Sequence, residues 1–176
     1  MRNLWLSLAV LSAVASSAAR ADVIIVEHGY REGYGPNLLL VDPGDLLNGV
    51  ITVEYERALA SWFGITVGAS VWAFQGVFGG PYYTAFVPEV GARFHFIRAA
   101  PGGLFIGPTL SAGYVVSRSD GPLTRAFAWG LGASLGYNFI FGDHFTFQLG
   151  LGGRFTDYGS SLVWSPRLLL GLGGAF

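Results

Sequence analysis

The run AFAWGLGASLGYNFIF at residues 126–141 alternates between large apolar side chains at odd positions and mostly glycine, alanine and serine at even positions. A period of two is typical of a β-strand, because successive side chains of a strand point to opposite faces. A strand of a soluble protein has about five or six residues, whereas a tilted strand that crosses a bilayer needs about 9–11. The length and alternation of this run therefore predict a membrane-spanning strand.

The same alternation returns along most of the chain. It is found at residues 49–57, 62–74, 84–96, 103–116, 144–155 and 162–176. Together with the first run, these segments predict seven strands, and an eighth is expected before Gly49. Two candidates stay open for it: NLLLV at 37–41, ahead of the turn formers DPGD at 42–45, and VIIVE at 23–27.

The distribution of charge distinguishes a membrane barrel from a soluble sandwich, whose strands turn a charged face to water. Charged residues make up 12% of this chain, against about 25% in an average soluble domain. In hydrocarbon every backbone group needs an internal partner, and for strands only a closed barrel supplies one. A helical membrane protein is disfavoured by the period of two and by Pro81 and Pro88 within an uncharged stretch. We therefore predict an all-β fold, a closed antiparallel transmembrane β-barrel of eight strands.

Residues 1–21 have the order of a secretory signal peptide. A basic start and an apolar stretch up to about Val14 are followed by small residues that end in ARA at 19–21. This order predicts cleavage before Asp22 and leaves 22–176 as the barrel. The apolar stretch is shorter than the about 20 residues of a membrane-spanning helix, which disfavours an uncleaved anchor.

The expected connections alternate in length. The longer ones are at 75–83, 117–124 and 156–161, and the shorter ones are at 57–61, 97–102 and 141–144. Long loops at one end and short turns with both chain ends at the other is the arrangement of bacterial outer-membrane barrels. Aromatic residues near the strand ends fit interfacial girdles, whereas Trp72 is expected to point inward and fill the lumen. The apolar loop segment FGGPYY at 78–83 is a candidate contact surface.

The leader, the alternating strands, the segment GVITVEYERALASWFGITVGAS and the terminal LLLGLGGAF together resemble the small outer-membrane β-barrel proteins of Gram-negative bacteria. The transmembrane domain of outer membrane protein A and outer membrane protein X are familiar types. The resemblance implies a porin-like, monomeric barrel in the outer membrane, in contact with its lipids. It also implies an assembly signal, read by the barrel-assembly machinery, in which alternate apolar residues end in an aromatic one. In this chain the signal comprises Leu168, Leu170, Leu172 and Phe176.

Most of the charged residues on the predicted strands fall on the inward faces. The candidate lumen network comprises Glu54, Glu56, Glu89, Arg93, His95, Gln148, Arg154 and Arg167. Charges in a narrow lumen must pair, so we expect a structural ion-pair network that plugs the barrel and leaves it a structural or surface-interaction role. The alternative is a small pH-sensitive channel in which His95 modulates the pairs, since histidine changes charge near neutral pH.

Other classes of function find little support in the sequence. With arginine as the only basic residue type and a net charge of −1, there is no basic patch for nucleic acid. A lipid-modifying enzyme is the second alternative, but His28, His95 and His144 lack the His-x-Ser pairing that outer-membrane deacylases of this kind carry. The three histidines have no metal-ligand spacing, and the chain has no cysteine. We expect neither catalysis nor a cofactor.

Overall fold

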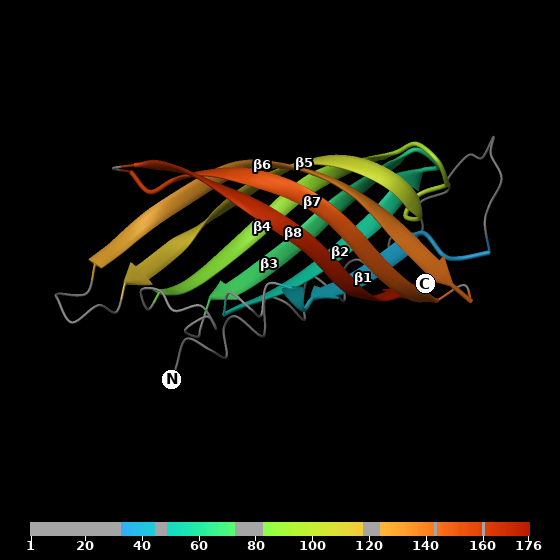
Figure 1. The fold of residues 1–176 in the computed structure, drawn as a ribbon, viewed down its shortest axis with the longest axis horizontal. Helices are drawn as coiled ribbons and strands as arrows, with labels where there is room; N and C mark the ends of the chain where they lie inside the picture. Colours follow the sequence, from blue (N-terminus) through green and yellow to red (C-terminus); the bar gives the residue numbers. More distant parts are fainter. Residues whose placement is uncertain (1–32, 45–48, 73–82, 118–123, 143, 160) are drawn as a thin grey trace.

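Eight antiparallel strands close into a barrel in the computed structural model (Figure 1). The structure describes residues 33–44, 49–72, 83–117, 124–142, 144–159 and 161–176. The strands are β1 (Asn37–Asp42), β2 (Val50–Ala60), β3 (Phe63–Trp72), β4 (Tyr83–His95), β5 (Gly103–Ser117), β6 (Thr124–Phe141), β7 (Phe145–Asp157) and β8 (Leu162–Ala175). Each pairs with the next strand in the chain, and β8 pairs with β1. The predicted all-β closed antiparallel barrel is confirmed.

The register of the strands sets the dimensions of the barrel. Stepping from Leu38 to the paired residue on each following strand leads to Ser165 on β8, whereas Leu38 itself pairs with Ala175, ten residues further along that strand. With a rise of about 3.3 Å per residue and about 4.8 Å between strands, this offset corresponds to a strand tilt of about 41°. Each residue then advances about 2.5 Å along the barrel axis. An eight-stranded barrel of this tilt has an interior that side chains fill.

The two faces of the sheet differ as the sequence predicts. The outer face exposes large apolar side chains, among them Ile65, Val67, Val90, Ile106, Leu110, Leu131, Leu135, Leu149, Leu151, Leu168 and Leu172. The inner face buries polar ones, among them Thr52, Glu56, Thr66, Ser70, Glu89, Arg93, His95, Ser111, Asn138, Thr146 and Gln148. Apolar groups outside and polar groups inside is the reverse of a soluble domain.

The first strand is apolar on both faces. Leu38 and Leu40 point inward and are buried, whereas Leu39 and Val41 are exposed on the outside. Of the two candidates for this strand, the structure places the NLLLV segment in β1. The VIIVE segment and the signal peptide predicted at 1–21 lie outside the described residues.

The two ends of the closed sheet meet at one end of the barrel, which we call the terminal end. The Asn37 N–H donates to the Phe176 carbonyl at 3.0 Å, and the Phe176 N–H donates to the Asn37 carbonyl at 2.9 Å. The Asn37 side-chain amide donates to the same Phe176 oxygen at 2.8 Å. The side chain of Phe176, the last residue of the predicted assembly signal, is exposed on the outside.

The connections follow the predicted alternation with two exceptions. Those at the terminal end cover 61–62, 96–102 and 142–144, and those at the opposite end cover 43–49, 73–82, 118–123 and 158–161. The prediction of a longer loop at 156–161 is wrong, because β7 continues to Asp157 and leaves only 158–161 as the connection to β8. The prediction of a short turn at 97–102 is also wrong, because the connection between β4 and β5 covers 96–102 and is longer than the one at 158–161. Most of the apolar segment at 78–83 lies outside the described residues.

Aromatic side chains gather on the outer face near both ends of the barrel. At the terminal end, ring contacts join Trp62, Phe63, Phe94, Tyr137, Phe139, Phe141, Phe145 and Phe147. Toward the opposite end, Tyr114, Phe127, Trp129, Phe155 and Trp164 are exposed. Trp129 and Phe139 lie ten residues apart on β6, so the two girdles are about 25 Å apart along the axis, the height of the apolar band of an outer-membrane barrel. Within the described ranges, no helix has the length and apolarity to cross a bilayer.

Candidate functional site

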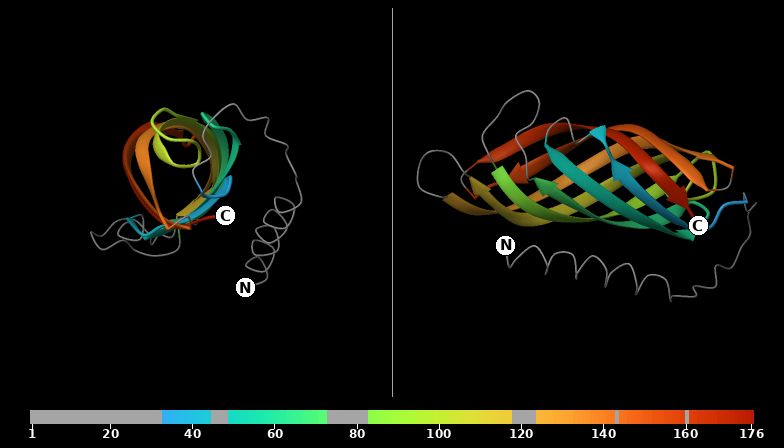
Figure 2. Two further views of the ribbon diagram at one scale, coloured as in Figure 1. Left: turned by 90° about the vertical axis from the view of Figure 1, so that its right-hand side faces the viewer. Right: turned by 90° about the horizontal axis from the view of Figure 1, so that it is seen from below.

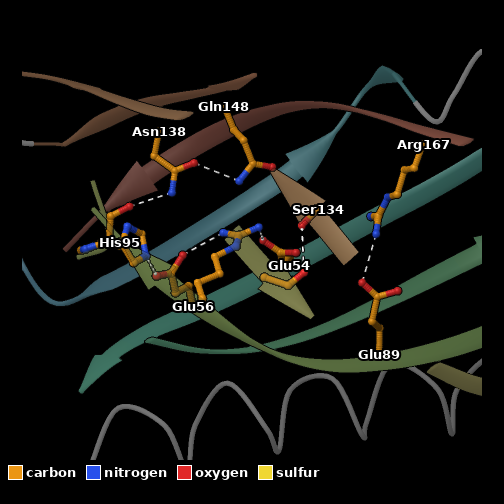
Figure 3. A network of polar contacts seen from close by, with 11 residues as sticks. Glu54, Glu56, Glu89, His95, Ser134, Asn138, Gln148 and Arg167 are labelled. Carbon is orange, nitrogen blue, oxygen red and sulfur yellow. Dashed lines mark hydrogen bonds and ion pairs between the residues drawn. The ribbon is translucent and has the colours of Figure 1, made fainter. Parts of the chain in front are cut away.

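All eight residues of the predicted lumen network lie on the inner face of the barrel, but they form two groups instead of one. The terminal-end cluster comprises Glu54, Glu56, Arg93, His95 and Gln148, which Asn138 joins. The central cluster comprises Glu89, Arg154 and Arg167. Glu89 precedes His95 by six residues on β4, which places it about 15 Å further from the terminal end. Figure 3 shows Glu89 and Arg167 facing one another apart from the other group.

Glu56 is the centre of the terminal-end cluster. Its Oε2 accepts a hydrogen bond from Arg93 Nη1 at 2.7 Å, and its Oε1 lies 2.8 Å from His95 Nε2 (Figure 3). The side chains of Glu56 and His95 are both 0% exposed. Arg93 also pairs with Glu54 through its second terminal nitrogen. A carboxylate taken out of water in this way is stable only because both of its oxygens have partners.

The 96–102 connection bonds to this cluster from the terminal end. His95 Nδ1 lies 2.7 Å from the Gly102 carbonyl, and Asn138 Nδ2 donates to the Pro101 carbonyl at 2.7 Å. Pro101 is among the most deeply buried residues of the described chain. Figure 2 (left) views the barrel from this end and shows the connection, in yellow-green, folded over part of the ring of strands. The connection and the cluster are thus bonded to one another at this end of the lumen, and we call them together the plug.

Further contacts hold Arg93 and Gln148 in place within the plug. The Arg93 guanidinium lies 4.2 Å from the centroid of the Phe105 ring, a cation–π contact, and Phe105 is 0% exposed. Gln148 Nε2 donates to Asn138 Oδ1 at 2.9 Å, and with its amide turned over, Gln148 accepts from Arg93 at 3.1 Å and 3.2 Å. In either orientation Gln148 links the cluster to β6 and β7.

Glycines on the inner face make room for these side chains. A Cβ at Gly64 would lie 2.6 Å from Glu56 Oε1, and one at Gly136 would lie 2.6 Å from Phe105 Cζ. Both distances are shorter than van der Waals contact. The period-two glycines of the sequence therefore have a packing role, because they stand beside bulky or charged neighbours on adjacent strands.

The central cluster is a three-residue ion-pair group. Arg154 Nη2 bonds to one oxygen of Glu89, and Arg167 Nη1 donates to the other at 3.0 Å. The three residues come from β4, β7 and β8, so this group ties distant parts of the sequence together across the lumen. The side chains of Glu89 and Arg167 are 9% and 18% exposed, against 0% for Glu56 and His95 in the plug.

Apolar residues fill the lumen toward the opposite end. Ala85, Val115 and Ala128 are buried together, and Trp72, Val87 and Tyr158 pack against them. Trp72 is thus an inward-facing lumen filler, as predicted. Tyr158, just beyond the end of β7, also packs against this cluster and so lies apart from the girdle residues.

Each of the two described histidines has a hydrogen-bond partner within the protein. His95 Nε2 faces Glu56, and His144 Nδ1 lies 3.3 Å from the Ala175 carbonyl at a turn. Among the described residues, no group of three or more histidine, cysteine or acidic side chains could hold a metal ion. His28 lies outside the described residues.

Sequence reasoning missed Asn138 and the part played by the 96–102 connection. Asn138 is 0% exposed and bonds to both Pro101 and Gln148. The signal was present, because Asn138 is the one large polar residue on the glycine face of its strand. No protein-family model matches this chain, and neither a curated protein nor a solved structure matches it.

Proposed function

We propose that this chain is an integral outer-membrane β-barrel protein of a Gram-negative bacterium, with a structural or surface-interaction role and a lumen closed by the plug. The observation that carries the proposal is the inversion of polarity: large apolar side chains cover the outside of a closed barrel, and charged side chains are paired inside it. Water around such a surface would make it an aggregation site, whereas lipid accommodates it.

The spacing of the aromatic girdles supports a transmembrane position. Girdles about 25 Å apart match the height of the apolar band that outer-membrane barrels present to lipid. A leader at 1–21 would direct the chain across the inner membrane, and the barrel-assembly machinery would then insert it. The residues proposed as its signal are Leu168, Leu170, Leu172 and Phe176. Lipid is then the main partner of the outer face, and we propose a monomer without cofactor.

The pairing of the inner charges supports a role other than transport. Glu54, Glu56 and Glu89 are matched by Arg93, Arg154 and Arg167, so neither cluster leaves a wide path lined by charges of one sign. We also propose that the barrel acts without catalysis. In support, His95 faces a carboxylate and a backbone carbonyl, and among the described residues no serine hydroxyl lies at hydrogen-bond distance from its ring.

A small pH-sensitive channel is the second candidate, because His95 lies within the plug. Planar-bilayer recordings of the refolded chain at pH 5 and pH 8 separate the two. We expect no discrete conductance steps at either pH. That the refolded chain is a folded barrel is checked on the same preparation by the change in its gel migration on heating. Conductance steps that appear or change in size between the two pH values would favour the channel and contradict the closed lumen.

A further inference from the structure

His95 has an acceptor on both of its ring nitrogens. Nδ1 lies 2.7 Å from the Gly102 carbonyl, and a carbonyl oxygen can only accept a hydrogen bond. Nε2 lies 2.8 Å from Glu56 Oε1, and an ionised carboxylate can also only accept. A neutral imidazole carries one N–H and cannot satisfy both. The pair must therefore hold one proton more than a neutral histidine and a carboxylate, either as an imidazolium beside a carboxylate or as a neutral ring beside a carboxylic acid.

Removal of that proton affects one contact more than the other. The single remaining N–H goes to the stronger acceptor, which is the ionised carboxylate of Glu56. Nδ1 is then bare and faces the Gly102 carbonyl at 2.7 Å, so two lone pairs oppose each other where a hydrogen bond stood. The 96–102 connection thereby loses its hydrogen bond to His95 on β4. Water cannot replace that bond, because the side chains of His95 and Glu56 are both 0% exposed.

The surrounding charges do not replace this proton. Arg93, on the same strand as His95, bonds to the other oxygen of Glu56 and to Glu54 on β2. From the N-terminal segment, the Tyr34 hydroxyl donates to the Ala99 carbonyl at 2.7 Å and contacts the connection instead of the ring. From β6 and β7, the residues that the structure shows bonded within the plug are the neutral Asn138 and Gln148. The contact between His95 Nδ1 and the Gly102 carbonyl is therefore the one that depends on the extra proton.

We propose that the proton shared by Glu56 and His95 holds the 96–102 connection against the barrel end, so that the plug is tight at low pH and loosens as pH rises. The inference deepens the proposed plug and rests on it. It does not depend on whether the barrel resides in an outer membrane or conducts ions, so it is tested on purified barrel in detergent micelles.

Amide hydrogen exchange of the connection measures this directly. The Ala100 N–H donates to the Ser61 carbonyl at 2.8 Å, and the Gly102 N–H donates to the Ala99 carbonyl at 2.9 Å. Their protection factors, corrected for the intrinsic pH dependence of exchange, are compared at pH 6 and pH 9. We expect protection to fall by about tenfold or more at pH 9, the loss of one charge-assisted hydrogen bond.

The decisive variant is Glu56→Gln. A glutamine there can donate from its amide nitrogen to a neutral His95 Nε2 and accept from Arg93 with its oxygen, so both contacts survive without the extra proton. The variant should therefore keep the connection protected at both pH values. Glu89→Gln, in the central cluster, is the matched control and should keep the pH dependence of the unmodified chain.

The outcomes are distinct. Unchanged protection between pH 6 and pH 9 in the unmodified chain would overturn the proposal, as would an equal loss in Glu56→Gln. If that variant does not fold, the ¹⁵N shifts of the His95 ring in the unmodified chain decide. Nδ1 should be protonated at pH 6, and a bare Nδ1 at that pH would refute the shared proton.

Discussion

Leu151 and Leu162 offer a matched test of whether lipid surrounds the barrel. Both point outward, and their exposures are nearly equal at 68% and 67%. They differ in depth: Leu151 lies midway between Phe147 and Phe155 on β7, whereas Leu162 begins β8 beyond the girdle residue Trp164. Replacement of each by arginine therefore compares one chemical change at two levels of the same outer face.

The expected costs follow from the solvent at each level. An arginine on the lipid face of a barrel costs about 2–4 kcal/mol at the midplane and about 0–1 kcal/mol near the interface. We therefore expect Leu151→Arg to lower the free energy of unfolding by about 2 kcal/mol or more relative to Leu162→Arg. If water surrounded the barrel, both exposed positions would accept arginine within about 0.5 kcal/mol.

Urea unfolding in phospholipid vesicles, followed by tryptophan fluorescence, measures both variants beside the unmodified chain. Equal midpoints and slopes for the two variants would refute a lipid-covered outer face. The two sites are almost equally exposed, so the expected difference in the free energy of unfolding comes from their depth in the lipid. Leu151→Ala controls for the loss of the leucine itself.

Three further predictions concern the interior and the closing strand. Glu56→Ala should lower the free energy of unfolding in urea by about 3–5 kcal/mol, because it leaves buried partners without a carboxylate. Glu89→Ala should lower it by less, because the Glu89 side chain is more exposed than that of Glu56, and the reverse order would contradict the assignment of the plug. Gly136→Ala should cost about 1–3 kcal/mol, because its Cβ would stand 2.6 Å from Phe105 Cζ, and an unchanged unfolding midpoint would count against a filled lumen. Deletion of Phe176 should reduce the yield of inserted barrel in cells more than it lowers the unfolding free energy of barrel already formed, and undiminished insertion would contradict the proposed assembly signal.

The two faces of each strand were predictable because the side-chain period of a strand is two. That rule alone places Glu56, Arg93 and His95 inside and Leu131 and Leu168 outside, and the structure agrees. It fails for β1, where Leu38 to Val41 are apolar throughout, so nothing in the alternation distinguishes the inner leucines from the outer ones.

The partners of the inner charges were not predictable in the same way. Glu89 meets Arg167, which lies 78 residues away, only because the shear of the closed barrel brings β8 to that level. Shear is a property of all strand registers together, and no single strand encodes it. The division of the network into two clusters follows from that geometry. The inward fold of the 96–102 connection depends on the acceptors that Asn138 and His95 find there, contacts that no local turn signal describes.

The most direct test of the account is the migration of the protein from fractionated cells that express the chain with its leader. Closed outer-membrane barrels resist denaturation in sodium dodecyl sulfate until heated, so the account predicts a protein in the outer-membrane fraction whose unheated form migrates differently from its heated form. A soluble periplasmic protein, with the same migration before and after heating, would contradict the proposal of an outer-membrane barrel.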